Sequence, residues 1–283
     1  MMRSIAWNYA KTLKCILPGV RQMSSSGSLT TVEVNDKTGI ATLTLNRPPV
    51  NGLNLELLTS IKNSIEEIEN NKSKGLILTS SSKTIFSGGL DIMEMYKPDP
   101  ERVKAFWTAL QDAWITLYGC SVPSVALVNG HSPAGGCLLA TSCEYRVMLP
   151  NYTIGLNETK LGIVAPEWFM SAFLNVLPRR TAEIALTQGK LFTTDEALQA
   201  GLIDEIAATK EEGIVKCEQF IASFAKCNPI ARAMTKQKMR QSALDGLINS
   251  KEQDLQLFLF IITQPMVQKG LGLYLEGLKK KKA

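Results

Sequence analysis

The 283-residue sequence contains a single histidine, His131, and its six cysteines show no Cys-x-x-Cys pair and no regular spacing. A zinc site made of cysteine and histidine is therefore not expected, and no other metal is assigned. Because the cysteines form no disulfide framework, we expect buried free thiols in a reducing compartment. The cysteines are Cys15, Cys120, Cys137, Cys143, Cys217 and Cys227.

Long apolar runs and basic stripes are also missing. No run is long enough to span a bilayer, so no integral membrane segment is expected. The net charge of +5 lies largely at the two ends, and basic residues are not interleaved with aromatic ones. This pattern argues against a nucleic-acid partner and against a non-catalytic role on RNA or a membrane. Lys279–Lys282 is interpreted as a solvated helix end, with a phosphate- or partner-binding patch as the alternative.

Acidic residues are absent from Met1 to Thr31, where basic residues are spread among apolar ones. With a serine-rich run behind it, this composition predicts a mitochondrial transit peptide and flexible segment over residues 1–30, and hence a location in the mitochondrial matrix. A disordered basic tail is the alternative. The basic residues are Arg3, Lys11, Lys14 and Arg21, and the residues of the possible apolar face are Ile5, Trp7, Leu13, Ile16 and Leu17.

Beyond this segment, strand–turn–helix units predict an α/β core over residues 31–205, followed by a helical region over residues 206–283. Thr194 is expected to cap the helix that it begins. The expected strands are a hairpin over 32–45 and single strands over 75–79, 123–130 and 146–149. The expected helices cover 55–70, 92–96, 102–118, the segment from the glycine turn at Pro133–Cys137 to about 142, 165–177, 180–187, 194–200, 211–227 and 229–270.

Two turns centred on Gly-Gly pairs lie where a strand ends and a helix is expected to begin, at Phe86–Asp91 and Pro133–Cys137. Such turns leave backbone N–H groups without partners inside a helix. Two of them side by side could form an oxyanion hole, and Glu158 could act as a base beside it. A single Gly-Gly pair is more often a tight loop, and Asp91 is expected to cap the helix that follows it.

These motifs occur in the order found in the crotonase (enoyl-CoA hydratase/isomerase) superfamily, which the sequence resembles from about Thr31 to about residue 270. The resemblance implies a crotonase-like spiral of ββα units with a helical C-terminal region that serves in trimerisation. It also implies an acyl-CoA thioester whose oxygen is bound by the N–H groups of Leu90 and Gly135, within a homotrimer. The implied substrate-binding residues are Gly88, Gly89, Leu90, Asp91, Ile92, Gly135 and Asn157. The motifs are Asn46-Arg47-Pro48, Phe86–Asp91, Val128-Asn129-Gly130 with Ala134–Cys137, and Cys143–Arg146.

The acids decide which reaction is expected. Hydratases of this family carry two glutamates, and this chain has Leu138 at the first of these positions and Glu158 at the second. With a single glutamate at these two positions, the sequence resembles the Δ3,Δ2-enoyl-CoA isomerases, the mitochondrial ones in particular. Other acids are given structural roles: Glu144 is expected to pair with Arg146, and Glu167 lies on a different loop.

The expected reaction converts a 3-cis- or 3-trans-enoyl-CoA into the trans-2-enoyl-CoA in fatty acid beta-oxidation. Glu158 would move one proton from C2 to C4. No metal or redox cofactor is expected, since CoA is part of the substrate. Asn157 is expected to position the acyl chain or Glu158 by hydrogen bonding, and His131 has no role. The alternative is an enoyl-CoA hydratase or another acyl-CoA activity on the same fold.

Overall fold

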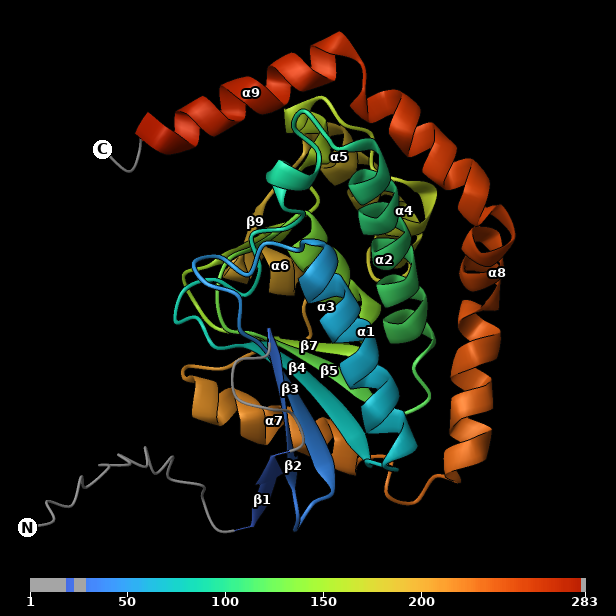
Figure 1. Ribbon diagram of the computed structural model, residues 1–283. Helices are drawn as coiled ribbons and strands as arrows, with labels where there is room; N and C mark the ends of the chain where they lie inside the picture. Colours follow the sequence, from blue (N-terminus) through green and yellow to red (C-terminus); the bar gives the residue numbers. More distant parts are fainter. Residues whose placement is uncertain (1–18, 23–28, 281–283) are drawn as a thin grey trace, which may run out of the picture.

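The computed structural model describes residues 19–22 and 29–280, and a seven-stranded sheet lies at its centre (Figure 1). The strands occur in the order β1-β2-β3-β4-β5-β7-β10; β1, β2 and β3 are antiparallel neighbours, and the remaining pairs are parallel. The strands of this sheet are β1 (Val20–Gln22), β2 (Thr30–Asn35), β3 (Ile40–Leu45), β4 (Gly75–Ser80), β5 (Ser124–Val128), β7 (Tyr145–Met148) and β10 (Glu205–Ile206).

A second, three-stranded sheet contains β6 (Ser132–Pro133), β8 (Thr153–Gly155) and β9 (Phe192–Thr193). Helices supply the rest of the regular structure, and they dominate after residue 206, so the predicted α/β class with a helical C-terminal region is confirmed. They are α1 (Leu55–Asn70), α2 (Pro100–Gly119), α3 (Gly135–Ser142), α4 (Glu167–Leu174), α5 (Arg179–Gln188), α6 (Thr194–Ala200), α7 (Lys210–Ala222), α8 (Pro229–Ile262) and α9 (Pro265–Lys280), with two short 3₁₀ helices, η1 (Ile92–Glu94) and η2 (Glu158–Leu161).

The central strands are apolar on both faces because helices cover both faces. Along β4, Leu76 and Leu78 pack into the larger core with α1, α2 and α3, while Ile77 packs on the other side with α7. Successive side chains of a strand point to opposite faces, so a strand buried on both sides needs a continuous apolar run. Figure 1 shows α7 on one side of the sheet and α1 and α3 on the other.

The register of β4 and β5 positions the two glycine turns. These strands are parallel neighbours, with Leu76 opposite Ser124 and Leu78 opposite Ala126. Their carboxyl ends therefore meet at the same edge of the sheet, which is where α/β proteins usually bind ligands. Since one glycine turn follows each strand, the pairing brings together two segments more than forty residues apart in the sequence.

Several element boundaries differ from the expected ones. Thr193, not Thr194, caps α6, in a reciprocal capping box with Glu196. Thr194 instead donates its hydroxyl to the carbonyl of Leu149, at 2.9 Å. The single helix expected over 229–270 is two helices, because Pro265 cannot continue α8 and instead begins α9.

The sheet also begins earlier than expected, because β1 pairs with β2 inside the range assigned to the transit peptide and flexible segment. An edge strand held by backbone hydrogen bonds needs no marked apolar pattern, so no pattern of residues indicated β1. The rest of that assignment, residues 1–18 and 23–28, lies outside the described residues.

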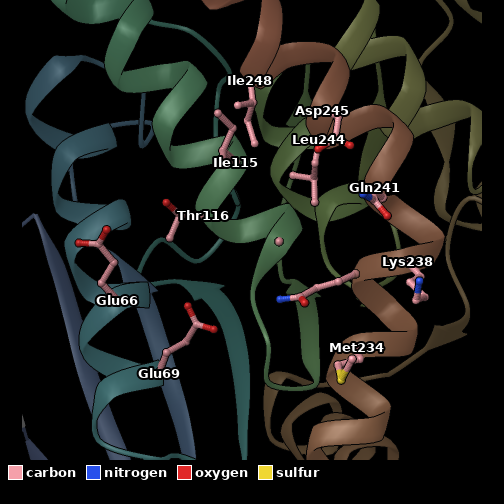
Figure 2. A pocket seen from close by; sticks show the side chains of 12 residues that line it. Glu66, Glu69, Ile115, Thr116, Met234, Lys238, Gln241, Leu244, Asp245 and Ile248 are labelled. Carbon is pink, nitrogen blue, oxygen red and sulfur yellow. The ribbon is translucent and has the colours of Figure 1, made fainter.

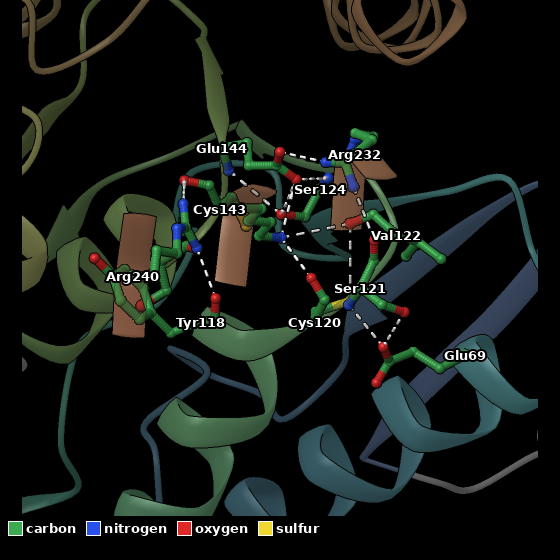
Figure 3. A network of polar contacts seen from close by, with 12 residues as sticks. Glu69, Tyr118, Cys120, Ser121, Val122, Ser124, Cys143, Glu144, Arg232 and Arg240 are labelled. Atoms are coloured by element: carbon green, nitrogen blue, oxygen red, sulfur yellow. Dashed lines mark hydrogen bonds and ion pairs between the residues drawn. The ribbon is translucent and has the colours of Figure 1, made fainter. Parts of the chain in front are cut away.

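Helix α8 is attached to the core by buried charges (Figure 3). Glu144 forms ion pairs with Arg232 and Lys236, so the expected pair with Arg146 is wrong. Arg146 instead pairs with Asp204, at 2.6 Å. The ammonium of Lys236 is buried and also donates to the carbonyl of Cys120, at 2.6 Å. A buried cation needs such partners, so Glu144 serves to fix α8.

Candidate active site

The first glycine turn is stabilised by the neighbouring loop that contains Leu53. The N–H of Leu53 donates to the carbonyl of Gly89 at 2.8 Å, and the N–H of Asp91 donates to the carbonyl of Leu53 at 3.0 Å. The N–H of Gly88 donates to the carbonyl of Val50 at 2.8 Å. The N–H of Gly89 donates to the hydroxyl of Ser87 at 3.2 Å, so the N–H groups on both sides of Leu90 are used, whereas that of Leu90 has no acceptor among the described residues.

The second turn is positioned by the small sheet. Pro133 of β6 lies opposite Gly155 of β8, and the N–H of Ala134 donates to the carbonyl of Gly155 at 2.8 Å. Ala134 has a positive φ of 50°, and α3 begins directly after it at Gly135. As the first residue of a helix, Gly135 has an N–H without a partner in its own helix.

The two turns touch each other, and this contact requires glycine. A Cβ at Gly89, where φ is +85°, would lie 3.0 Å from the Cβ of Ala134 and 3.3 Å from the nitrogen of Gly135. A Cβ at Gly135 would lie 2.9 Å from Leu53 Cδ1 and 3.4 Å from the nitrogen of Leu90. The N–H groups of Leu90 and Gly135 are therefore neighbours, as an oxyanion hole requires.

Glu158 reaches this place because it follows β8, the partner of β6. It is the first residue of η2 and is 8 % exposed. Neither carboxylate oxygen has a hydrogen-bond partner within the described part of the chain. Burial away from water therefore raises the pKa of Glu158 to about 7. A buried carboxyl without a partner is costly, and such groups mark functional sites.

Glu158 and the first turn share one cavity of about 730 Å³. Apolar residues form most of its lining, many of them from α4 and α8, and the carboxylates of Glu167 and Asp254 line it as well as that of Glu158. Ligand sites typically combine an apolar cavity with a small number of converging polar groups. The apolar and aromatic lining includes Leu90, Ile92, Met95, Trp107, Leu161, Ile163, Val164, Ala165, Trp168, Phe169, Met170, Leu174, Leu247, Leu257, Phe258 and Ile261.

Most of the expected site residues lie here. Those that line the cavity are Gly88, Leu90, Ile92, Asn157 and Glu158; Gly89 and Gly135 are buried where the turns meet.

Two expected site residues, Asp91 and Asn157, differ from the roles expected of them. Asp91 does not line the cavity: it pairs with Arg47 at 2.8 Å and accepts a hydrogen bond from the N–H of Met93, as expected of a cap. Asn157 lines the cavity, but it forms no hydrogen bond with Glu158, and its Oδ1 has no partner among the described residues.

Leu138 and His131 do not contribute to the cavity lining. Leu138 is buried in the core within α3, so no second acid stands at the position where the resemblance places one in hydratases. His131 Nδ1 lies 3.0 Å from the hydroxyl of Thr153, and its ring packs against Tyr152.

A second hollow of about 630 Å³ lies between α1, α2 and α8. Figure 2 shows Glu66 and Glu69 on one side of it and the α8 side chains from Met234 to Ile248 on the other. Neither glycine turn reaches this groove, and it does not contain Glu158. The groove therefore lacks the combination of donors and base that makes the first cavity the candidate active site.

The chain belongs to the enoyl-CoA hydratase/isomerase family, whose model matches residues 35–282. It is 43% identical over 267 residues to "Enoyl-CoA delta isomerase 1, mitochondrial" of Rattus norvegicus, covering 93% of this chain and 91% of that relative. The crystal structure of human mitochondrial delta3-delta2-enoyl-CoA isomerase is similar, with 40% identity, a TM-score of 0.87, and coverage of 90% of this chain and 100% of that one. An enoyl-CoA hydratase from Bacillus halodurans matches with 26% identity, a TM-score of 0.77, and coverage of 87% and 100%. The family and the crotonase-like fold predicted from the sequence are confirmed.

Proposed function

We propose that the protein is a Δ3,Δ2-enoyl-CoA isomerase of fatty acid beta-oxidation. One observation carries the proposal: Glu158 is a single buried, unpartnered carboxylate in an apolar cavity beside the neighbouring N–H groups of Leu90 and Gly135. With Leu138 in the core, Glu158 stands without the second acid that the resemblance places at that position in hydratases. The isomerases of rat and human, which are 43% and 40% identical to this chain, support the same reaction.

In the proposed reaction, the thioester carbonyl oxygen of a 3-enoyl-CoA accepts hydrogen bonds from the N–H groups of Leu90 and Gly135. The Glu158 carboxylate removes a proton from C2, and the electron pair of that C–H bond forms the C1–C2 double bond of a dienolate while the carbonyl π pair moves onto the oxygen. The two N–H donors stabilise the negative charge on the oxygen. Glu158 then returns the proton to C4: the carbonyl re-forms, the C1–C2 pair becomes the C2–C3 double bond, and the C3–C4 pair takes the proton, which gives the trans-2-enoyl-CoA.

The surroundings of Glu158 suit a group that must both accept and release a proton. General acid–base catalysis is most effective when the pKa of the group lies near the working pH. Burial raises the pKa of Glu158 to about 7, which meets this condition. The apolar lining also keeps water away, so that the proton returns to the substrate rather than to solvent. We propose that no metal or redox cofactor takes part and that CoA enters only as part of the substrate.

The wild-type protein is expected to isomerise 3-enoyl-CoA substrates at least about 100-fold faster than it hydrates crotonyl-CoA, because one general acid–base group contributes roughly that factor or more. Formation of trans-2-enoyl-CoA and loss of the crotonyl-CoA double bond are followed with the same enzyme preparation. Hydration at a comparable rate would favour the alternative, a hydratase.

The pH dependence of kcat/KM reports the pKa values of the catalytic groups in the free enzyme. Glu158 must be ionised to take the C2 proton, and its pKa is raised to about 7. We therefore expect log kcat/KM to fall with a slope of about one per pH unit below pH 7 and to level off above it. An activity that stays constant from pH 5 to pH 8 would be inconsistent with Glu158 as the base.

We propose a mitochondrial location, in the matrix, for the protein. The rat and human relatives are named as mitochondrial proteins, and the acid-free, basic N-terminal composition agrees with them. Among the described residues, no helix has the length and apolar character needed to cross a membrane.

We further propose that the protein forms a homotrimer through its C-terminal helices. Helix α9 exposes Met266, Leu273 and Leu278, and large apolar side chains exposed together on one element often mark an interface. We expect sedimentation of the purified protein at micromolar concentration to give three times the mass of the chain. A stable monomer would contradict the proposal.

A further inference from the structure

Three aromatic rings from three different helices form one side of the cavity. Trp107 lies on α2, Trp168 on α4 and Phe258 on α8, and all three line the cavity. Trp107 and Phe258 stack with their ring centroids 3.7 Å apart and their planes 6° from parallel. Trp107 and Trp168 meet edge to face, with centroids 6.1 Å apart. We call these three residues the aromatic wall.

One carboxylate connects the two tryptophans of the wall. The indole N–H of Trp107 donates to Asp254 Oδ2 at 2.7 Å, and the indole N–H of Trp168 donates to Asp254 Oδ1 at 3.1 Å. The side-chain amide of Gln111 donates to Oδ2 as well, at 2.7 Å. Hydrogen bonds to an ionised carboxylate are shorter and stronger than neutral ones, and buried indole N–H groups need a partner. Asp254 therefore fixes the orientation of both rings.

Among residues 29–280, Asp254 forms no ion pair. The hydrogen bonds that it accepts come from three neutral donors, the two indole N–H groups and the amide of Gln111. Asp254 stands one helical turn before Phe258, which places both side chains on the same face of α8. Ser250, another turn earlier, has non-helical backbone angles, and α8 bends there. Figure 1 shows that the second half of α8 passes beside α2 and α4, the helices that supply the tryptophans.

The aromatic wall and the catalytic groups come from different parts of the fold. Leu90 lies in the first glycine turn, and Gly135 and Glu158 begin α3 and η2 directly after the strands of the small sheet, whereas the wall belongs to α2, α4 and α8. Leu90 lines the same cavity as the three rings, so this apolar space is open to the acyl chain of a thioester bound by the two N–H groups. A chain that reached the wall would have to displace a stacked ring whose orientation is fixed by Asp254.

We propose that the aromatic wall sets the longest acyl chain that the site accepts and that Asp254 is the positioning residue that keeps the wall rigid. This inference rests on the proposed acyl-CoA function. Pockets that fit a hydrocarbon chain closely discriminate about 10-fold or more per methylene group, provided that their walls do not yield. Stacking and charge-assisted hydrogen bonds supply that rigidity here.

The first test is Phe258→Ala, with Phe260→Ala as its matched control, since Phe260 lies on the exposed side of the same helix. Saturated acyl-CoAs from butyryl-CoA to palmitoyl-CoA are titrated and their dissociation constants measured. We expect the first chain beyond the wild-type limit to bind about tenfold more tightly to Phe258→Ala, and the control to keep the wild-type limit. If Phe258→Ala does not fold, Phe258→Leu is used, with the same direction expected.

The second test is Asp254→Asn, which keeps the size of the side chain but replaces one acceptor by a donor that faces an indole N–H. We expect the ratio of kcat/KM for the two substrates on either side of the limit to fall about threefold to tenfold, the range of one hydrogen bond. Tryptophan emission should change together with it. Gln256→Ala, on the exposed side of α8, is the control and should change neither quantity.

The outcomes separate the two proposals. If the wild type has no isomerase activity but the longest acyl chain that binds changes in the Phe258 variants, the role of the aromatic wall would be supported and the proposed function refuted. An active isomerase whose limit stays unchanged in both Phe258 variants would refute the wall. An Asp254→Asn protein with wild-type chain discrimination would refute the role of Asp254.

Discussion

Replacement of Glu158 by glutamine is expected to lower kcat for isomerisation about 100- to 10,000-fold, the contribution of one general acid–base group. Glutamine has nearly the same shape but cannot take the C2 proton. Because the cavity and the two N–H donors remain, acyl-CoA should still bind. The measurement is trans-2-enoyl-CoA formation at saturating substrate, with the dissociation constant of a saturated acyl-CoA determined in parallel.

The same substitution should stabilise the folded protein at high pH. The pKa of Glu158 is raised from 4.5 in the unfolded chain to about 7 in the folded one. Below pH 4.5 both states are protonated and the carboxyl carries no penalty. Between these pH values the unfolded chain ionises while the folded protein does not, so wild-type stability falls as pH rises, by roughly 3 kcal/mol in all. Above pH 7 the penalty stays constant.

Glutamine cannot ionise, so Glu158→Gln should be about 3 kcal/mol more stable than the wild type at pH 8 and no more stable at pH 4. Denaturant unfolding at a fixed protein concentration measures the difference at both pH values. Glu183→Gln, at an exposed position, is the control and should change stability by less than about 0.5 kcal/mol.

The kcat measurement decides the mechanism. A folded Glu158→Gln protein that isomerises 3-enoyl-CoA at the wild-type rate would rule out the single-base mechanism.

Substitution of Gly135 by alanine is expected to lower kcat about 100- to 1000-fold, the usual cost of losing one oxyanion donor. The added Cβ would lie 3.4 Å from the nitrogen of Leu90 and 2.9 Å from Leu53 Cδ1. The methyl group thus occupies space beside one donor and forces the other to move. Both effects act on the charged transition state more than on the neutral substrate, so kcat should fall more than acyl-CoA affinity.

The matched control is Gly277→Ala, because a Cβ there meets nothing within 4 Å and alanine favours a helix. It should keep the kcat of the wild type. Circular dichroism and unfolding curves establish whether the Gly135→Ala protein is folded. If the folded protein keeps kcat within about threefold of the wild type, the two N–H groups do not form the oxyanion hole that the mechanism requires.

The features that were predicted correctly are local in the sequence. The period of apolar residues placed α1 at 55–70, and the Gly-Gly pairs marked the turns that follow β4 and β5. Glycine is informative here because the turns touch: the structure leaves no room for a Cβ at Gly89 or Gly135 without displacing a neighbour. Such close backbone contacts leave a visible signature in the sequence.

The errors concern partners that are distant in the sequence. Glu144 and Arg146 are two residues apart, yet each pairs with a residue from another element, because α8 brings Arg232 and Lys236 to Glu144. Ion pairs depend on which surfaces meet, and spacing along the chain does not reveal that. The cap of α6 was assigned to Thr194 instead of Thr193 for a similar reason. Either hydroxyl could have capped the helix, and that of Thr194 donates instead to the distant carbonyl of Leu149.

The aromatic wall was missed for this reason too. Its residues lie on α2, α4 and α8, and each one reads in sequence as an ordinary core aromatic. Within the apolar stretch from Leu255 to Ile262, Leu255, Phe258 and Ile262 are buried, and Phe260 faces outward. The pairing of Asp254 with Trp107 spans 147 residues, which no local pattern could indicate.

The sequence by itself determined the class of fold, the two glycine turns and the identity of the single carboxylate, because each depends on residue types at fixed local spacing. Only the tertiary structure decided that the turns touch, that Glu158 is buried without a partner among the described residues, and that α8 lines the cavity. Burial is what raises the pKa of Glu158 to about 7, and burial is a property of the packed chain.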